Sequence, residues 1–345
     1  MDKSFTDYIN KINDLAEGNE QIKSLLLDIF YRNVPNNINV ETKKILNQIH
    51  FPLKRKEEWQ CGHENCGGES CYSHEISENV FLKHLADQDS KLMILEEDIS
   101  GNTFFYAEKK VHKRNASNFP GYCLEHDSKL FKDIENRMPS LNEYFVNKQC
   151  LRSIRRKIFD LKLQARGVDK FLKDIEDDLL CSPLIKEYVV EPLDFKKSIL
   201  LERVKILRNV YDKVYSGIIR QDYLVKYREL GQPKLGYCFS EVFDCTIDTD
   251  PEECLLIFLK LDFAMDSKAF ICWIDNETSK QIAMDMADDY ETHFTDLMYD
   301  KKKKLIFSSK FIKQMDSDLK NIFLRDPDLY KLTVFERSLL TREFF

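Results

Sequence analysis

The amino-acid sequence predicts a helix-rich α+β fold, and three observations support this prediction. Glycine and proline are scarce, 10 and 9 in 345 residues, and the middle of the chain carries long apolar stripes at helical spacing. The last third instead begins with runs of aromatic and β-branched residues, which are typical of strands. A cluster of cysteines and histidines before the helical stripes indicates a small metal-binding module.

Four regions follow one another along the chain. Residues 1–50 carry two short helical patterns and are expected to form a helical lead-in. Residues 51–140 hold the Cys/His cluster in a small mixed module. Residues 141–234 are expected to form a helical region with at least two long helices. Residues 235–345 are expected to form a C-terminal α+β domain with a short antiparallel sheet.

Local patterns predict the individual elements. Pro183 and Pro192 are expected to separate the long helices, because proline interrupts a helix interior. The lysine run at 301–304 is expected to be a solvated loop or helix end. The other expected elements are helices at 78–86, 278–299 and 310–324, and strands at 92–95, 103–107, 236–246, 255–263 and 269–274.

Composition places the chain among globular proteins. Hydrophobic residues make up 43%, charged residues 32%, and the formal net charge is −7. The first twenty residues lack the apolar core of a secretory signal, and no apolar run reaches the ~20 residues of a membrane helix. A cytoplasmic location with no membrane partner is expected. Because the GxxxxGK[ST], GxGxxG and GxSxG motifs are absent, nucleotide hydrolases, Rossmann dehydrogenases and α/β-hydrolases are disfavoured.

The ten cysteines divide into two groups. Without an export signal they are expected to be reduced thiols or metal ligands rather than disulfides. Cys61, Cys66, Cys71 and Cys123 share one stretch with five of the seven histidines. The others lie among apolar neighbours and are expected to be small buried residues: Cys150, Cys181, Cys238, Cys245, Cys254 and Cys272.

Two close pairs of donors predict a zinc site. Zn²⁺ takes four ligands in a tetrahedron, usually Cys thiolates and neutral His. Cys61 and Cys66 are separated by four residues, within the spacing of a metal knuckle, and Cys123 and His126 form a CxxH pair at the start of an expected helix. Two residues between ligands allow both to face one ion from a helix N-terminus.

A knuckle paired with the first turn of a later helix is the layout of a treble clef, so the module is expected to be treble-clef-like. The set of ligands stays open at this stage. His63, Cys71 and His74 are spare donors, and any of them can replace a nominated ligand. Unrelated core cysteines and surface histidines are the alternative to a metal site.

His74 also raises the possibility of catalysis. HNH nucleases place a zinc-stabilised treble clef around a histidine that activates water opposite a metal-held phosphate. Asp127 and Asn118 are the candidate partners of such a base, and a nuclease would need a second divalent metal. The sequence leaves open whether the protein is an enzyme, with an HNH-like metal-dependent endonuclease as the candidate. A structural role for His74 is the competing interpretation.

Three segments of the cysteine-rich region occur in a distinctive order: CGHENC at 61–66, SHEIS at 73–77 before a helix, and NASNFPGYCLEHDSKLFKDIE at 115–135. In motif order and spacing they resemble an uncharacterised bacterial family with a C-x4-C pair, an SH-I motif and an F-x-G-F-C-x-x-H-D segment. A weaker match follows at 305–311, where Phe311 stands in place of a family tryptophan. The resemblance implies the zinc module and a bacterial phage-defence context, and it implies no reaction.

Basic residues near the module suggest a nucleic-acid partner. Lys109, Lys110, Lys113 and Arg114 precede the second ligand pair, and phosphate is the natural partner of such a cluster. A second basic group follows, made of Arg152, Arg155, Arg156 and Lys157. The negative net charge limits any contact with DNA or RNA to a local patch. A solvated protein face is the alternative interpretation.

The sequence therefore predicts a zinc-binding protein that binds or acts on nucleic acid, as an HNH-like nuclease or a degenerate relative. The alternative is a non-enzymatic interaction or sensor protein with a purely structural zinc site, whose helical or C-terminal region binds a protein partner. A redox sensor with a free cysteine is disfavoured, because the reactive thiols are arranged as ligand pairs.

Overall fold

The computed structural model describes most of the chain after the predicted lead-in. The described residues are 53–100, 103–135, 140–179, 191–244, 254–325, 327 and 330–345. The lead-in at 1–50 lies outside them, as do Cys181, Pro183 and Cys245. The chain divides into two compact units: the larger contains Lys56–Glu97, Tyr106–Asp160 and Lys205–Phe345, and the smaller includes Asp98–Phe105 and Leu161–Val204.

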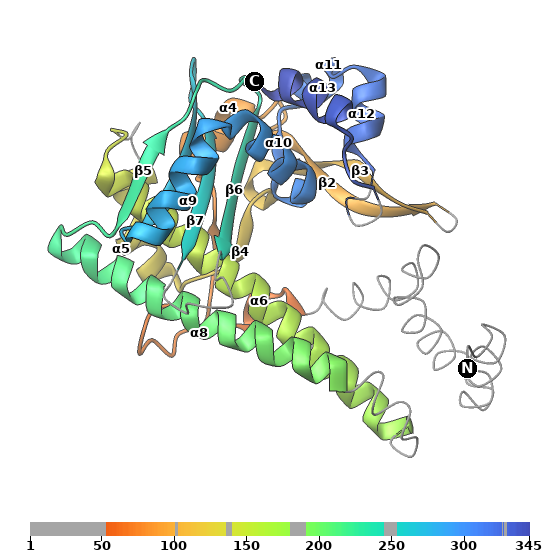
Figure 1. The fold of residues 1–345 in the computed structure, drawn as a ribbon. Coiled ribbons are helices and arrows are strands. Elements are labelled where there is room, and N and C mark those ends of the chain that lie inside the picture. Colours follow the sequence, from red (N-terminus) through yellow and green to blue (C-terminus); the bar gives the residue numbers. More distant parts are fainter. Residues whose placement is uncertain are drawn as a thin grey trace. The chain divides into compact units, whose positions relative to one another are not determined.

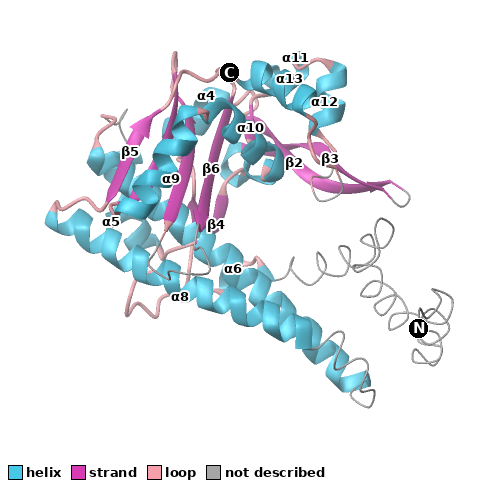
Figure 2. Cartoon of the chain, viewed as in Figure 1, coloured by secondary structure: helices cyan, strands magenta, loops and turns pink. Residues whose placement is uncertain are grey.

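Helices and strands both contribute to the fold, as predicted (Figures 1 and 2). The strands are β1 (Tyr72–His74), β2 (Lys91–Ser100), β3 (Thr103–His112), β4 (Asn118–Pro120), β5 (Val225–Glu229), β6 (Tyr237–Asp244), β7 (Leu255–Asp262), β8 (Ser267–Ile274) and β9 (Ile306–Phe307). The α-helices are α4 (Lys83–Leu85), α5 (Leu124–Glu135), α6 (Glu143–Leu179), α8 (Glu191–Arg220), α9 (Glu277–Asp288), α10 (Tyr290–Asp300), α11 (Ser309–Gln314), α12 (Ser317–Phe323) and α13 (Val334–Phe344). Short helical turns are η1 (Lys56–Glu58), η2 (Glu78–Leu82, a π-helix), η3 (Lys113–Asn115) and η5 (Lys302–Lys304).

One sheet joins strands from three of the regions predicted from the sequence. Its strand order is β3-β2-β9-β6-β7-β8-β5. The pairings from β2 through to β5 are antiparallel, so the predicted type of sheet is confirmed. It is larger than expected, because β2 and β3 from the cysteine-rich region and β5 from the helical region belong to it. The link is β9, where Phe307 pairs with Met93 on one side and Tyr237 on the other.

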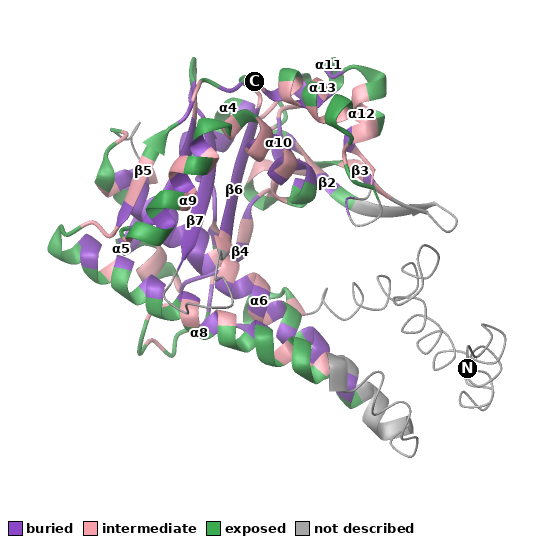
Figure 3. Ribbon diagram, viewed as in Figure 1, coloured by how far each residue is buried: buried purple, intermediate pink, exposed green. Residues whose placement is uncertain are grey.

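The centre of the sheet is covered on both faces. All eight residues of β7 are buried (Figure 3). One face packs against α9, α10 and α13 in a single apolar cluster that includes Phe258 and Phe294. On the other face, Ser153 of α6 hydrogen-bonds Ser240 of β6 at 2.8 Å. Burial on both sides explains why β7 is an almost continuous apolar run rather than an alternating one.

The two long helices of the middle region are present as α6 and α8. Their predicted apolar stripes are buried, for example at Ile154 and Val210. Pro192 does not interrupt a helix, because it lies in the first turn of α8, where a missing N–H costs nothing. In the part of the chain that the structure describes, no helix is long and apolar enough to cross a membrane.

The expected helix at 278–299 is two helices, α9 and α10, separated at Asp289. The expected helix at 310–324 likewise divides into α11 and α12, because the Asp316 carboxylate caps a new N-terminus by accepting from Leu319 N–H. An apolar stripe at helical spacing continues across such breaks, so it does not reveal them.

The lysine run at 301–304 follows the end of α10, as predicted, but only Lys301 and Lys303 are exposed. Lys302 is fully buried and donates hydrogen bonds to the carbonyl oxygens of Phe323 and Arg325. Lys304 pairs with Asp160 of α6 at 2.6 Å and with Glu75 at 3.7 Å. The expectation of a solvated segment was wrong for Lys302 and Lys304, because sequence charge alone does not show which ammonium groups meet buried acceptors.

The second basic group of the sequence also points inward. Arg152 is fully buried and contacts Glu135 at 2.6 Å. Arg156 pairs with Asp160 at 3.0 Å, and Lys157 pairs with the buried Glu241. These cations on α6 join the cysteine-rich region to the sheet. They are therefore structural, and their ion pairs leave them unsuited to contact a phosphate backbone.

We predict that Lys304→Met will lower the free energy of unfolding by about 3 kcal/mol, because it leaves the carboxylates of Asp160 and Glu75 short of a cation in a largely buried site. The neighbouring Lys301→Met is the control, since Lys301 is exposed and should change stability by less than about 0.5 kcal/mol. Urea unfolding followed by circular dichroism measures both. Equal stability of the two variants would contradict the role given to Lys304.

Candidate metal centre

The segment from Cys61 to Gly68 folds into a tight knuckle. The Cys61 N–H donates to the Gly68 carbonyl at 2.8 Å, and the Cys66 N–H donates to the His63 carbonyl at 3.2 Å. Asn65 adopts a left-handed conformation with φ of 58°, which asparagine tolerates better than most residues. The His63 N–H lies 3.5 Å from the Cys61 sulfur. These bonds aim both cysteine side chains at one point.

A short strand pair and a helix place the other two donors. β1 pairs with β4 antiparallel, with His74 opposite Asn118. The chain leaves β4 at Pro120 and begins α5 at Leu124. His126 lies in the first turn of α5, where the Asp127 N–H donates to the Cys123 carbonyl at 2.9 Å. Helical spacing therefore turns Cys123 and His126 to the same side.

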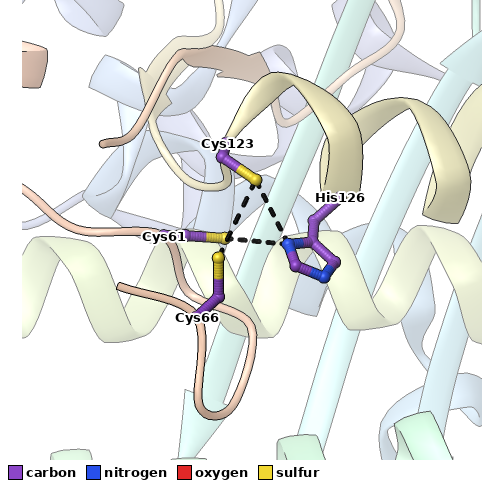
Figure 4. Close-up of side chains that lie close together, drawn as sticks. All are labelled: Cys61, Cys66, Cys123 and His126. Carbon is purple, nitrogen blue, oxygen red and sulfur yellow. Dashed lines mark hydrogen bonds between the residues drawn. The ribbon is translucent and has the colours of Figure 1, made fainter. Parts of the chain in front are cut away.

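Cys61, Cys66, Cys123 and His126 converge as the sequence predicted (Figure 4). Their donor atoms all lie within 4.8 Å of one another, and the group can hold a metal ion. His126 Nδ1 is 3.1 Å from the Cys123 sulfur and 3.5 Å from the Cys61 sulfur, and the Cys66 and Cys123 sulfurs are 4.0 Å apart. Tetrahedral zinc geometry requires about 3.6 Å between sulfur and nitrogen and about 3.8 Å between sulfurs.

The thiols differ in their surroundings. Burial raises the pKa of the Cys61 thiol to about 11, so its thiolate needs a nearby positive charge. Burial also opposes ionisation of Cys123, but hydrogen bonds, first among them that of the His126 backbone, lower the pKa of the Cys123 thiol overall. A bound divalent cation would favour the thiolate form of all three cysteines.

Arg155 of α6 braces the centre from behind. Its guanidinium donates to the Gly121 carbonyl at 3.1 Å, and the Gly62 N–H donates to the same oxygen at 2.9 Å. A Cβ on Gly62 would lie 2.0 Å from Arg155 Nε, so the knuckle needs glycine there. Arg155 is buried, and three thiolates with one divalent ion would carry a single negative charge beside it. From its sequence neighbours, Arg155 was expected to belong to a phosphate-binding group, and nothing in the sequence indicates its contact with the knuckle.

The three spare donors lie outside the group of four. The His63 ring stacks on the His126 ring with 3.9 Å between centroids, and its Nε2 is 3.2 Å from the Tyr215 hydroxyl. Cys71 hydrogen-bonds through its backbone N–H to Tyr122. His74 Nε2 lies 3.0 Å from the Arg114 carbonyl.

The structure brings together two of the three candidate catalytic residues. The His74 ring and the Asn118 side-chain amide both donate to the Arg114 carbonyl, the latter at 3.2 Å. Burial lowers the pKa of the His74 imidazole, which favours its neutral form. Among the described residues no hydrogen bond joins Asp127 to either residue.

The first basic group is mostly exposed but paired with acids. Lys109 contacts Glu96 at 2.9 Å and Lys110 contacts Asp87 at 2.7 Å. Lys113 and Arg114 both lie within 4 Å of one carboxylate, that of Glu78. Exposed ion pairs of this kind are weak and do not prevent phosphate binding. They do reduce the positive potential of this group.

Comparisons with known proteins find no match to this chain, whether protein-family models, curated proteins or solved structures are searched. The resemblance to a bacterial family therefore remains a prediction.

We predict that Arg155→Met will weaken metal binding by about 10- to 100-fold, because it removes the cation and the donor that hold Gly121 and the knuckle together. Arg208→Met provides the control: Arg208 is an exposed arginine whose charge acts on Arg155, and among the described residues no hydrogen bond joins the two side chains. Competition with a chromophoric chelator measures both affinities. Indistinguishable affinities would rule out the bracing role.

Proposed function

We propose that the protein is a zinc-stabilised nucleic-acid-binding protein in which the metal is structural. The convergence of three cysteines and one histidine carries this proposal. Zinc favours this donor set, and four protein ligands leave no open position for substrate or water, which is typical of structural rather than catalytic sites. The metal would contribute to folding and would fix the knuckle against α5.

The chain order around the site supports a treble-clef-like module. A knuckle is followed by the β1–β4 pair, and the ligands of the second pair lie at the start of the next helix. The segment between β1 and β4 is unusually long for so small a module. Residues 75–117, between β1 and β4, include β2 and β3, which belong to the large sheet. The zinc would therefore support the attachment of the sheet as well as the module.

Charge next to the ligands favours a nucleic acid over a protein partner. Lys129 and Lys132 lie on α5 one and two turns after His126, and both are exposed. Within the described residues, neither has a carboxylate within 4.0 Å. Unpaired cations attract phosphate more strongly than the paired cations of the first basic group, which contains Lys109 and Lys110. The competing hypothesis, a protein-interaction or sensor protein, shares the structural zinc but requires no binding of nucleic acid.

Nuclease activity is the second candidate, and the pairing of His74 with Asn118 across β1 and β4 favours it. A phosphate-binding metal would need further donors beside them. The group at Cys61 is the one set of three or more metal donors found among the described residues, and it does not include His74. Binding without cleavage is therefore our first choice.

Zinc content tests the metal assignment. Cys66→Ser or Cys123→Ser should reduce zinc well below one per chain and lower the melting temperature, because structural zinc contributes directly to folding. Cys71→Ser is the matched control and should retain full zinc, since Cys71 lies outside the group. Elemental analysis of the purified variants decides the matter. Full zinc in both ligand variants would refute the assignment.

Incubation with labelled DNA and RNA in Mg²⁺ or Mn²⁺ tests the choice between binding and cleavage. We expect the wild type to shift the mobility of the probes and to leave them intact. Metal-dependent cleavage that disappears in His74→Ala, with zinc content unchanged, would establish the nuclease instead. Absence of any shift at low salt would favour the protein-interaction hypothesis.

A further inference from the structure

A groove opens beside the metal centre. It has a volume of about 790 Å³, within the range of ligand-binding pockets. α5, the beginning of α6 and the end of α8 line it, and His63 and His126 stand at its metal end. Leu130, Leu151 and Ile218 supply apolar surface. The exposed Ile219 adds to this surface, with 66% of its area accessible.

Some cations along the groove are paired with an acid and others are not. Lys148 is nearly buried and donates to both oxygens of Asp133, at 2.8 and 2.7 Å, so this pair is neutral. Tyr144 donates to the same carboxylate. Lys129 and Lys132 also line the groove and have no such partner in the part of the chain described. The groove therefore presents two unpaired positive charges above an apolar floor.

The metal end adds a hydrogen-bond donor. His126 directs Nδ1 at the cysteine sulfurs, and its other ring nitrogen points away from them (Figure 4). When Nδ1 binds a metal, the neutral ring carries its proton on Nε2 and can donate it. His63 stacks on this ring and contacts the Tyr215 hydroxyl at 3.2 Å. Two flat rings and two tyrosines thus lie along the groove.

We propose that this groove binds a single-stranded nucleic acid, with Lys129 and Lys132 on phosphates and unpaired bases against Tyr144, Tyr215 and Ile219. This inference rests on the proposed function and gives it a site. Backbone cations combined with aromatic and apolar surface suit exposed bases, whereas a duplex hides its base faces. The concave shape of the groove also favours a flexible single-stranded nucleic acid over a stiff duplex.

The first basic group, which contains Lys109 and Lys110, is the competing site for nucleic acid. Its lysines supply a matched comparison for the lysines of the groove. Binding of fluorescein-labelled 12-nucleotide DNA and RNA to the zinc-loaded full chain would be measured by anisotropy across a salt series. Lys129→Ala/Lys132→Ala should lower affinity by about tenfold or more and reduce the slope of log affinity against log salt by about 1.4, for two lost phosphate contacts. Lys109→Ala/Lys110→Ala removes the same charge from paired lysines and should change affinity less than about twofold.

A second variant keeps the test independent of the lysines. Ile219→Glu places a negative charge on an exposed position of the groove, so it should preserve zinc content and fold while weakening single-strand binding. The wild type should bind the single strand more tightly than the matching duplex, and poly-glutamate should compete poorly.

Several results would overturn the inference. Binding that is lost in Lys109→Ala/Lys110→Ala but kept in Lys129→Ala/Lys132→Ala and in Ile219→Glu would place the binding site at the first basic group. The groove would then be excluded, while the proposed function would still hold. Equal affinity for duplex, or equal competition by poly-glutamate, would overturn the single-strand specificity in favour of duplex or an acidic peptide. No binding by the wild type at low salt would overturn both this inference and the proposed function.

Discussion

The convergence of Cys61 and Cys66 with Cys123 and His126 is the constraint on which the rest of the structure depends. Cys66 and Cys123 are 57 positions apart, and the chain between them contributes β2 and β3 to the large sheet. A cross-link across such a loop stabilises the folded chain by about 4 kcal/mol in the chain-entropy estimate. A metal at this point would therefore fix the base from which two strands of the sheet extend, besides closing a small module.

Buried charge on α6 complements this constraint. Arg155 braces the metal centre, while Arg156 shares Asp160 with Lys304 from the C-terminal region. These contacts hold the knuckle, the helix and the sheet in one unit. Removing any one of these cations leaves a buried acid or carbonyl with one partner fewer, which costs more than an exposed ion pair would contribute.

Local chemistry made much of this predictable. The two ligand pairs could be predicted from their spacing, because knuckles and helix N-termini impose short-range rules, and the long helices and main strands followed from apolar periodicity.

Features that depend on long-range contacts could not be predicted from the sequence. β9 is a two-residue strand without a pattern, although it joins the cysteine-rich strands to the rest of the sheet. The partners of Arg155 and Lys304 lie far away in sequence. The sequence therefore does not show that these cations are buried and paired, whereas other lysines and arginines are exposed. The role of Gly62 depends on Arg155, and the groove depends on α5 meeting α8.

X-ray absorption at the zinc edge of the purified full-length protein tests the central claim most directly. It reports the type and number of atoms bound to the metal without altering the chain. The four converging residues predict three sulfur atoms at about 2.3 Å and one nitrogen at about 2.0 to 2.1 Å, with one zinc per chain. A coordination shell of nitrogen and oxygen alone, or a protein purified without metal that folds and melts like the zinc-loaded form, would contradict the account.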